Sequence, residues 1–431
     1  MMRGTEGEVR LQVTLAYGEK GLPVELPDCA EVIRPREWSG VDDETGTIEA
    51  ALADPIGCRP LAEMLRPEQR VVVVFSDITR PMPSERILPP LLRTIERVVP
   101  PERITLLNGL GTHRPNTRDE LVQMLGEEIV ADYRIEQHNA RDQDHLVTLG
   151  RTRAGGVVQV NRSYYEADAR ILTGLIEPHF FAGFSGGPKA VLPGIAGIDC
   201  IMDNHGYERL RDPGATWGRT HGNPLWEELR EAAAMAAPAF LLNVTVNRER
   251  AITGVYAGDW RDAHARGVEA ARRHAMVAVD APYDVVVSTN SGYPLDLNLY
   301  QSVKGMSCAA QIVKPGGTII LAAECRYGVP AESAYGRLVR EAGSIEAILR
   351  TVGQPGFRCQ DQWQAQIQAR IMQKARVVVY SEGLDAETLE GMLFESCDDV
   401  STAVRQAMDQ HGPEARLCVL PEGPQTIPYL A

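Results

Sequence analysis

Short runs of β-branched and other apolar residues recur along this chain and alternate with stretches of helical periodicity. The runs lie at 71–75, 104–107, 170–175, 240–246, 284–288, 318–322, 376–380 and 417–420. Each run is long enough for one strand, and nearly continuous apolar character is typical of strands that are buried on both faces. Strands that alternate with helices favour parallel sheets covered by helices. We therefore expect an α/β fold with largely parallel sheets.

The length of the chain, 431 residues, is sufficient for two or three domains. A helical pattern over 260–281 separates a long first part from a second series of strands. We expect the boundary near residue 275, which gives domains of 1–275 and 276–431 with an active-site cleft between them. In open α/β sheets the ligand lies beyond the carboxyl ends of the strands, so the turns after the strands are where catalytic residues are expected.

Charge and cysteine content narrow the class of protein. A net charge of −14 without a run of lysine or arginine argues against a nucleic-acid partner. The eight cysteines form no C-x-x-C pair, which favours reduced thiols. The N-terminus lacks the apolar centre of a signal peptide, and no apolar run has the length that spans a bilayer. We expect a cytoplasmic protein with a small-molecule ligand and no membrane partner.

The segment 178–190, with the sequence PHFFAGFSGGPKA, combines a histidine, several glycines and a lysine directly after a predicted strand. Its glycines, which can adopt positive φ and let a ligand approach the backbone, are Gly183, Gly186 and Gly187. The N–H groups of a helix start bind anions, and Lys189 adds a positive charge at the same place. In a P-loop the lysine is followed by a serine or threonine that holds magnesium, but Ala190 follows here, which disfavours a magnesium-dependent nucleotidase.

Polar motifs also follow the first two predicted strands. The motif SDITRP contains Asp77 and Arg80. A guanidinium group pairs with a carboxylate through two bonds, so Arg80 is suited to an anionic substrate, although internal pairing with Asp77 is an alternative. The motif GTHRP contains His113, and histidine is the side chain best suited to move a proton near neutral pH. His179 occupies the equivalent position after a third strand.

Two more segments carry candidate residues. The motif DNHG places His205 about one helix beyond Lys189, where the imidazole either caps the helix or binds a metal. No other His, Cys or carboxylate stands at zinc-site spacing around His205. The motif YQSVK places Tyr300 and Lys304 four residues apart, so a helix presents both on one face. A solvent-exposed helix face is the alternative for this second motif.

Together, in this order and over most of the chain, these segments resemble the nickel-dependent lactate racemase family. The resemblance implies a two-domain α/β protein that carries a nickel-pincer nucleotide, the nickel complex of pyridinium-3-thioamide-5-thiocarboxylic acid mononucleotide. In this cofactor a ring carbon and two sulfur atoms bind the nickel, and a protein histidine supplies the remaining ligand. By position in its motif that ligand is His205, and the two acid/base groups are His113 and His179.

The same resemblance implies further roles. The residues assigned to the cofactor are Asp77, Gly183, Ser185, Gly186, Gly187, Lys189 and Tyr300. In some members of the family the lysine is covalently joined to the cofactor through a thioamide. The residues assigned to the substrate are Arg80, Gln301, Lys304 and Trp363, the last as a tryptophan that closes over the substrate. Cofactor-synthesis proteins are implied partners, and an oligomer is possible.

The chemistry of a 2-hydroxy acid explains the two histidines. Its C2 proton is too weakly acidic for imidazole, whereas hydride removal leaves a planar 2-oxo acid that accepts hydride on either face. One histidine then serves each enantiomer. We predict a racemase or epimerase of lactate or a related 2-hydroxy acid.

Three other functions are alternatives to the racemase. The first is a nicotinamide-dependent 2-hydroxy acid dehydrogenase, although no G-x-G-x-x-G motif follows a strand with an acidic residue at the expected distance. The second is a noncatalytic nucleotide- or cofactor-binding protein that uses the glycine-rich segment as an anion cradle. The third, a magnesium-assisted enolisation, is disfavoured because the successive strand ends do not carry the set of carboxylates that magnesium requires.

Overall fold

The computed structural model describes residues 10–331 and 333–431. The chain forms two compact units, here called the N-terminal unit, 37–205 with 212–274, and the C-terminal unit, which comprises 206–211, 275–431 and the described part of 1–36. One passage between the units lies next to the boundary expected near residue 275. The units differ from the sequence-based domains of 1–275 and 276–431 because two earlier segments are grouped with the C-terminal strands.

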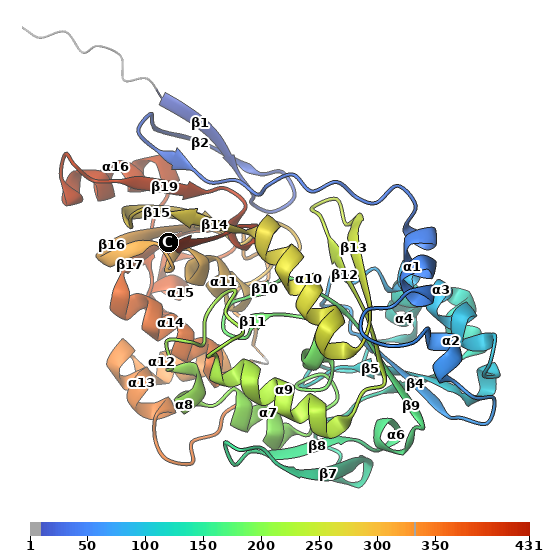
Figure 1. Ribbon diagram of the computed structural model, residues 1–431. Coiled ribbons are helices and arrows are strands. Elements are labelled where there is room, and N and C mark those ends of the chain that lie inside the picture. Colours follow the sequence, from blue (N-terminus) through green and yellow to red (C-terminus); the bar gives the residue numbers. More distant parts are fainter. Residues whose placement is uncertain (1–9, 332) are drawn as a thin grey trace, which may run out of the picture. The chain divides into compact units, whose positions relative to one another are not determined.

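The sheet of the N-terminal unit has six strands in the order β13-β12-β9-β4-β5-β6 (Figure 1). Its strands are β4 Val71–Ser76, β5 Ile104–Gly109, β6 Arg134–Gln137, β9 Ala169–Leu175, β12 Phe240–Val246 and β13 Ile252–Gly258. All neighbours are parallel except the edge pair β12 and β13. The first five residues of β4 are all buried, as expected for a β-branched strand with both faces covered.

Helices cover this sheet. The helices of the N-terminal unit are α1 Glu44–Ala53, α2 Leu61–Met64, α3 Ser84–Glu96, α4 Arg118–Leu125, α5 Glu127–Asp132, α6 Arg162–Glu166, α7 Ile198–Asn204, α9 Pro224–Ala236 and α10 Trp260–Ala275. Helices α1 to α5 share one apolar cluster with Val71, Val73 and Phe75 of β4. Thr117 and Glu120 form a reciprocal capping box at the start of α4. A hairpin of β7 Leu146–Arg151 and β8 Val157–Asn161 lies outside the sheet.

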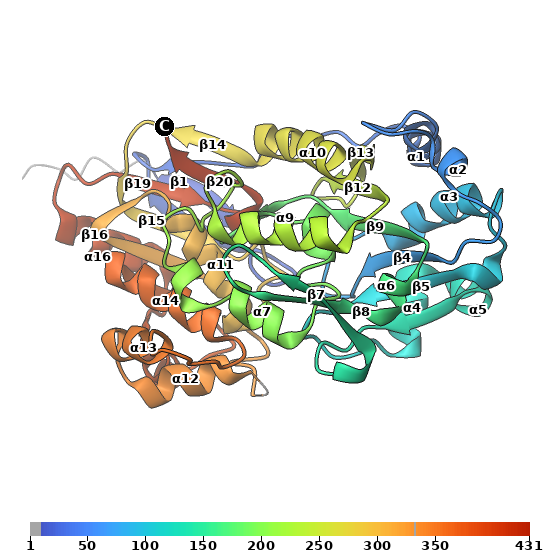
Figure 2. The ribbon, with the colours of Figure 1, turned by 60° about the horizontal axis from the view of Figure 1, so that its bottom comes forward.

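The C-terminal unit contains a second six-stranded sheet, in the order β18-β17-β16-β15-β19-β3, with parallel neighbours throughout (Figure 2). Its strands are β3 Glu31–Val32, β15 Tyr283–Thr289, β16 Val313–Ala322, β17 Arg376–Tyr380, β18 Glu395–Ser396 and β19 Leu417–Leu420. Its helices are α8 Tyr207–Leu210, α11 Leu299–Ala309, α12 Ala334–Ala342, α13 Ile345–Val352, α14 Gln362–Lys374, α15 Ala386–Gly391 and α16 Val400–His411.

An N-terminal hairpin, β1 Arg10–Leu15 and β2 Leu22–Pro27, belongs to this second unit. Leu15 and Leu26 of the hairpin are buried in one cluster with Val285 and Val287 of β15. This apolar contact is the physical reason why the hairpin packs with the C-terminal strands.

Every strand expected from the apolar runs is present, and the α/β class with largely parallel sheets is confirmed. The helical pattern expected over 260–281 is shorter in the structure, because α10 ends at Ala275. The apolar residues that follow form β14 Met276–Val279, which pairs with β20 Ile427–Leu430. In the part of the chain that the structure describes, no helix combines the length and the apolar character needed to cross a membrane.

Candidate active site

The strand order of the N-terminal sheet reverses between β9 and β4. From β4 the chain continues to β5 and β6 on one side, whereas β9 and β12 extend the sheet on the other side. In parallel sheets, ligands bind beyond the carboxyl ends of the strands at such a reversal. Asp77 follows β4, and the short strand β10 Pro178–His179 follows β9. Two of the predicted motifs therefore flank the place where the fold favours a ligand.

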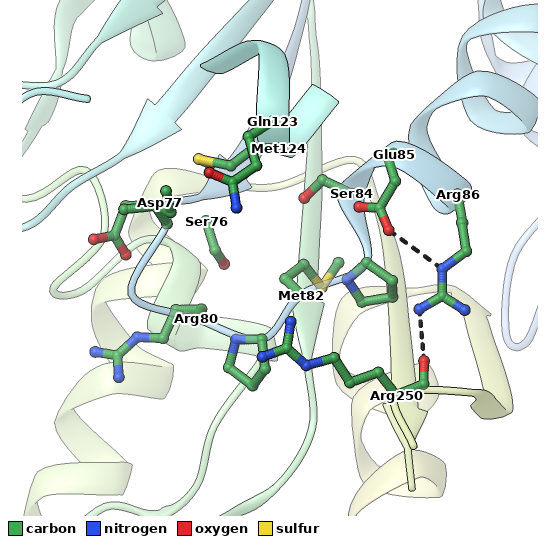
Figure 3. Close-up of a pocket in the computed structure, with 13 residues that line it drawn as sticks. Ser76, Asp77, Arg80, Met82, Ser84, Glu85, Arg86, Gln123, Met124 and Arg250 are labelled. Atoms are coloured by element: carbon green, nitrogen blue, oxygen red, sulfur yellow. Dashed lines mark hydrogen bonds and ion pairs between the residues drawn. The ribbon is translucent and has the colours of Figure 1, made fainter. Parts of the chain in front are cut away.

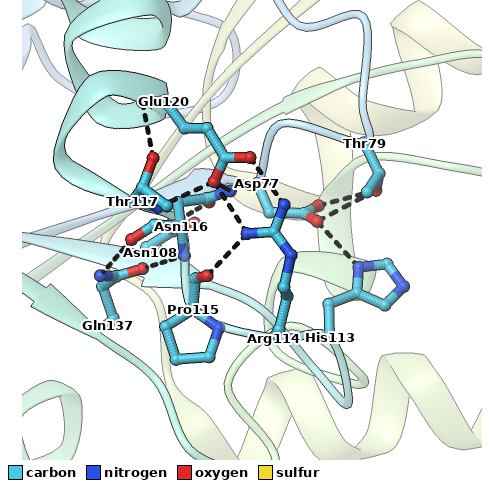
Figure 4. A network of polar contacts seen from close by, with 10 residues as sticks. All are labelled: Asp77, Thr79, Asn108, His113, Arg114, Pro115, Asn116, Thr117, Glu120 and Gln137. Carbon is cyan, nitrogen blue, oxygen red and sulfur yellow. Dashed lines mark hydrogen bonds and ion pairs between the residues drawn. The ribbon is translucent and has the colours of Figure 1, made fainter. Parts of the chain in front are cut away.

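Asp77 and His113 form a hydrogen-bonded pair at this edge (Figure 4). The distance from Nδ1 of His113 to Oδ2 of Asp77 is 2.8 Å, and Thr79 donates its hydroxyl to the same carboxylate. Burial acts to raise the pKa of Asp77, but the bond from His113 and the charge of Arg80 outweigh it, and the net pKa is lowered. Asp77 is therefore a carboxylate that accepts the Nδ1 proton, so neutral His113 has its lone pair on Nε2.

The pair with His113 replaces the internal Asp77–Arg80 pairing considered from the sequence. Arg80 contacts Asp77 through the backbone, where its N–H donates to the Asp77 carbonyl at 3.1 Å. The next cation of the GTHRP motif, Arg114, binds Glu120 instead, with a nitrogen to oxygen distance of 2.7 Å. The backbone N–H of Gly111 donates to the Gly194 carbonyl at 2.9 Å, which holds the turn with His113 against the chain that follows Lys189.

His179, Lys189 and His205 gather around the ring of Phe181. The ring centroids of His179 and Phe181 are 4.5 Å apart in an edge-to-face arrangement, and those of His205 and Phe181 are 5.1 Å apart. Nζ of Lys189 lies 5.7 Å from the centroid of the same ring. The structure therefore brings His205 of the DNHG motif together with two residues of the segment 178–190.

The orientation of His179 is set by a backbone contact. The N–H of Ala182 donates to Nδ1 of His179 at 3.2 Å, within the tight turn that joins β10 to β11 Gly183–Phe184. Because Nδ1 accepts this bond, the neutral ring of His179 carries its proton on Nε2. His113 and His179 thus have opposite tautomers, one with a lone pair and the other with a proton on Nε2.

His205 is a buried and uncharged imidazole. It is 7% exposed and follows the last residue of α7, where its backbone N–H donates to the Ile201 carbonyl at 2.9 Å. Burial, together with the charge of Lys189, lowers the pKa of His205 to about 3. The neutral ring is the form that binds metals. Over residues 10–331 and 333–431, no three His, Cys, Asp or Glu side chains are grouped so as to hold a metal ion.

The lysine loop, residues 183–189, differs from the expected helix start. It leads into a four-residue 3₁₀ helix, η3 Gly187–Ala190, and the next α-helix begins only at Ile198. The N–H of Gly187, which the sequence assigned to an anion, donates to Oδ1 of Asn243 at 2.8 Å. A Cβ at Gly183 would lie 2.2 Å from the Arg219 carbonyl oxygen. Close packing of the protein on the loop therefore accounts for these glycines.

The remaining candidates lie in the C-terminal unit and are described by themselves. Tyr300, Gln301 and Lys304 lie on α11, and all three are half-buried. Nε1 of Trp363 donates to the hydroxyl of Tyr300 at 3.1 Å, and that hydroxyl lies 3.3 Å from Oδ1 of Asp361. Trp363 itself is buried, with 7% of its surface exposed. The YQSVK helix is thus confirmed as a helix, and Trp363 packs beside it.

A pocket of about 160 Å³ opens beside the SDITRP motif (Figure 3). Asp77 and Arg80 contribute to its wall, together with residues of α3 and α4. Figure 3 shows Arg86 held by Glu85 and by the backbone of Arg250, whereas Arg80 extends away from them. The pocket is smaller than the ~300–1,000 Å³ that is typical for drug-sized ligands, so its size suits a small molecule.

Sequence reasoning missed residues that join these motifs. Thr79 binds Asp77, and Asp361 lies next to Tyr300 with a positive φ of 65°. Asn243 and His264 contact the lysine loop. An asparagine inside the largely apolar strand β12 was a usable signal, because a buried polar group needs a partner. His264 gave no such signal in the sequence.

Burial lowers the pKa of His264 to about 4, below its ordinary value of 6.5, so His264 makes stability depend on pH. Between these two values the unfolded chain binds more protons than the folded one, so stability present above pH 6.5 is lost as the pH falls toward 4. At pH 4.5 we expect the wild-type protein to have lost about 2 to 3 kcal/mol more than the non-titrating variant His264→Gln, relative to pH 7. Urea unfolding at both pH values measures this, and equal losses in the two proteins would contradict it.

The reversal point, the Asp77–His113 pair and the buried His205 give an α/β protein with candidate acid–base groups at the carboxyl edge of a parallel sheet. Comparisons with known proteins make the class specific. The Lactate racemase N-terminal domain model matches residues 17–218, and the Lactate racemase C-terminal domain model matches residues 278–427.

Individual proteins agree with these models. The chain is 39% identical to the lactate racemase of Lactiplantibacillus plantarum over 88% of this chain and 90% of that protein. It is 34% identical to the lactate racemase of Thermoanaerobacterium thermosaccharolyticum over 96% and 98% of the two chains. The solved apoprotein structure of the latter superposes with a TM-score of 0.90, at 33% identity, over 97% of this chain and all of that chain. The chain therefore belongs to the lactate racemase family.

A more distant solved structure, of a protein from Thermotoga maritima, shares the fold alone. It is 19% identical with a TM-score of 0.68, and the match covers 92% of this chain. The family resemblance found in the sequence is confirmed, and so is the prediction that the chain is an isomerase of the racemase type.

Proposed function

We propose that this protein interconverts the two enantiomers of lactate, or of a closely related 2-hydroxy acid, with the help of a nickel-pincer nucleotide. The observation that carries the proposal is the placement of His113 and His179 after strands that lie on either side of the strand-order reversal. Family membership supports the same reaction. It also favours the racemase over the dehydrogenase, the cofactor carrier and the enolisation considered from the sequence.

The residues of the N-terminal unit fit the cofactor. A pincer ligand brings most of the nickel ligands itself, so one neutral imidazole is the donor that the protein has to add, and buried His205 has that form. Lys189, close to the same Phe181 ring, is placed to hold the nucleotide. Gly183, Ser185, Gly186 and Gly187 are proposed to shape the loop that presents Lys189. When bound, the cofactor supplies a reversible acceptor for the substrate hydride.

The side chains then divide the proton transfers. Nε2 of His113 takes the hydroxyl proton of one enantiomer, and the Asp77 carboxylate stabilises the imidazolium that forms. For the other enantiomer, His179 returns a proton to the oxygen from its imidazolium form, and the bond from the Ala182 N–H to Nδ1 has to be released when that form is made. The positive charge of Arg80 binds the substrate carboxylate, so that the reacting carbon reorients while the carboxylate stays in place. For the C-terminal unit, we propose that Tyr300 contacts the cofactor and that Gln301, Lys304 and Trp363 contact the substrate.

Racemisation by the cofactor-loaded protein tests the proposal. We expect L-lactate and D-lactate, each supplied alone, to reach the same equal mixture, as measured by chiral chromatography. The protein without cofactor is the control and is expected to leave each enantiomer unchanged. A loaded protein that binds nickel yet leaves lactate and other 2-hydroxy acids unchanged would contradict the proposal.

Family membership implies a small-molecule substrate. We also propose that cofactor-synthesis proteins supply this chain, because the chemistry of the cofactor is unusual. All eight cysteines are free thiols in the structure, which supports a cytoplasmic location.

A further inference from the structure

Two buried polar side chains hold peptide groups of the lysine loop. Asn243 of β12 accepts the N–H of Gly187 at a distance of 2.8 Å, and its own amide donates to the Leu242 carbonyl at 3.1 Å. His264 of α10 donates from Nε2 to the Ser185 carbonyl at 2.9 Å. Asn243 is 0% exposed and His264 is 3% exposed. Because water cannot replace a lost partner at such buried positions, both bonds constrain the loop.

Glycines make room for both side chains. Gly174 of β9 lies opposite Asn243 in the sheet, and a Cβ there would approach the Asn243 amide to 3.0 Å. A Cβ at Gly186 would lie 2.8 Å from Oδ1 of Asn243, and one at Gly187 would lie 2.4 Å from the His264 ring. Three glycines are thus matched to two polar side chains. This match indicates a built contact between the loop and its support.

We infer that Asn243 and His264 are positioning residues that fix the lysine loop so that Lys189 can hold the cofactor. This inference rests on the proposed function. The two bonded peptide groups belong to Ser185 and Gly187, and the N–H of Lys189 donates to the Gly186 carbonyl between them at 3.1 Å. A fixed loop therefore fixes the backbone of Lys189. A lysine side chain loses much rotational freedom on binding, and a preset backbone limits the additional loss.

The test compares substitutions at His264 with the same substitutions at a matched histidine. His138 is 2% exposed, and its Nε2 donates to the Ala196 carbonyl at 3.0 Å, so it is buried and bonded like His264 but outside the loop. At each position leucine removes the donor, whereas glutamine keeps an N–H near the place of Nε2. Asn243→Leu removes the acceptor for Gly187. Each protein is incubated with limiting nickel-pincer nucleotide, and its nickel content is followed over time.

We expect His264→Leu and Asn243→Leu to load cofactor about tenfold more slowly than wild type, the usual range for supporting residues, with kcat lowered more than KM is raised. His264→Gln is expected to stay within about twofold of wild type. His138→Leu and His138→Gln are both expected to load cofactor at the wild-type rate. Equal loading by His264→Leu and His138→Leu would overturn the inference.

A second readout needs no cofactor. In the wild-type protein, hydrogen exchange at the amide of Gly187 is expected to be slow, and Asn243→Leu is expected to speed it while His138→Leu does not. Rapid exchange of this amide in the wild type would also overturn the inference, even if the variants fail to fold. A wild-type protein that never binds nickel would instead contradict the proposed function, whatever the exchange result.

Discussion

Replacing His179 by alanine is expected to slow the racemisation of lactate by about 10²–10⁴-fold, and the same change at His113 is expected to have an effect of similar size. Each substitution removes one of the two groups that exchange a proton with the substrate oxygen, so conversion fails in both directions. Initial rates from each pure enantiomer, measured by chiral chromatography with the cofactor-loaded variants, give the size of the loss.

The chain offers a matched control for His113. His145 donates from Nδ1 to Asp142 at 2.9 Å and is exposed, so it reproduces the histidine–carboxylate pair outside the sheet edge. His145→Ala is expected to leave the rate unchanged. Nickel content is expected to remain at the wild-type level in His113→Ala and His179→Ala, because neither ring is assigned to the metal. Alanine variants that racemise lactate at the wild-type rate would show that the proton carriers are other groups.

Asp77 contributes to the proton transfer through His113. The carboxylate selects the tautomer of His113 with a lone pair on Nε2, and it stabilises the protonated ring. Its environment is polar and hydrogen-bonded, which explains why its pKa is lowered although the group is buried. His179 is bonded instead to the backbone N–H of Ala182. The two imidazoles therefore have different partners.

The sequence predicted more of the fold than of the contacts that complete the site. Apolar runs such as 71–75 specify buried parallel strands by themselves, and the motifs after them necessarily meet at one edge of the sheet. The antiparallel edge strand β13 and the strand β14 were not predicted from the sequence, because strand pairing depends on residues outside the local pattern. For the same reason the hairpin of β1 and β2 could not be assigned to the C-terminal unit.

The site shows the same division. His113 and His179 were predictable because each follows a strand, and their tautomers were not, since these depend on Asp77 and on the N–H of Ala182. The glycines of the lysine loop were predicted to face an anion. In the structure the N–H of Gly187 is used by Asn243, a contact that links residues 56 positions apart. The local sequence pattern therefore identifies the candidate site residues, whereas tertiary contacts determine their hydrogen-bond partners and orientation.

The second large effect is expected at the metal. His205→Ala is expected to reduce the affinity of the protein for nickel by about 100-fold or more, because it removes the only protein donor assigned to the metal; even supporting residues of metal sites contribute 10–100-fold. Nickel analysis of the purified variant after exposure to the nickel-pincer nucleotide measures this. His221, an exposed histidine of the same unit, provides the control, and His221→Ala is expected to bind as much nickel as wild type.

Lys189→Ala tests the second contact to the cofactor. Without the ammonium group the cofactor is expected to be lost, whereas His205→Ala leaves the cofactor's own nickel donors in place and is expected to lower the bound nickel and the bound nucleotide together, which native mass spectrometry measures. His113→Ala is expected to retain both. If His205→Ala keeps its nickel, the metal ligand lies elsewhere and the cluster around Phe181 has another role. If all three variants lose nickel equally, the loss reflects general damage to the fold, and the separate roles assigned to these residues fail together.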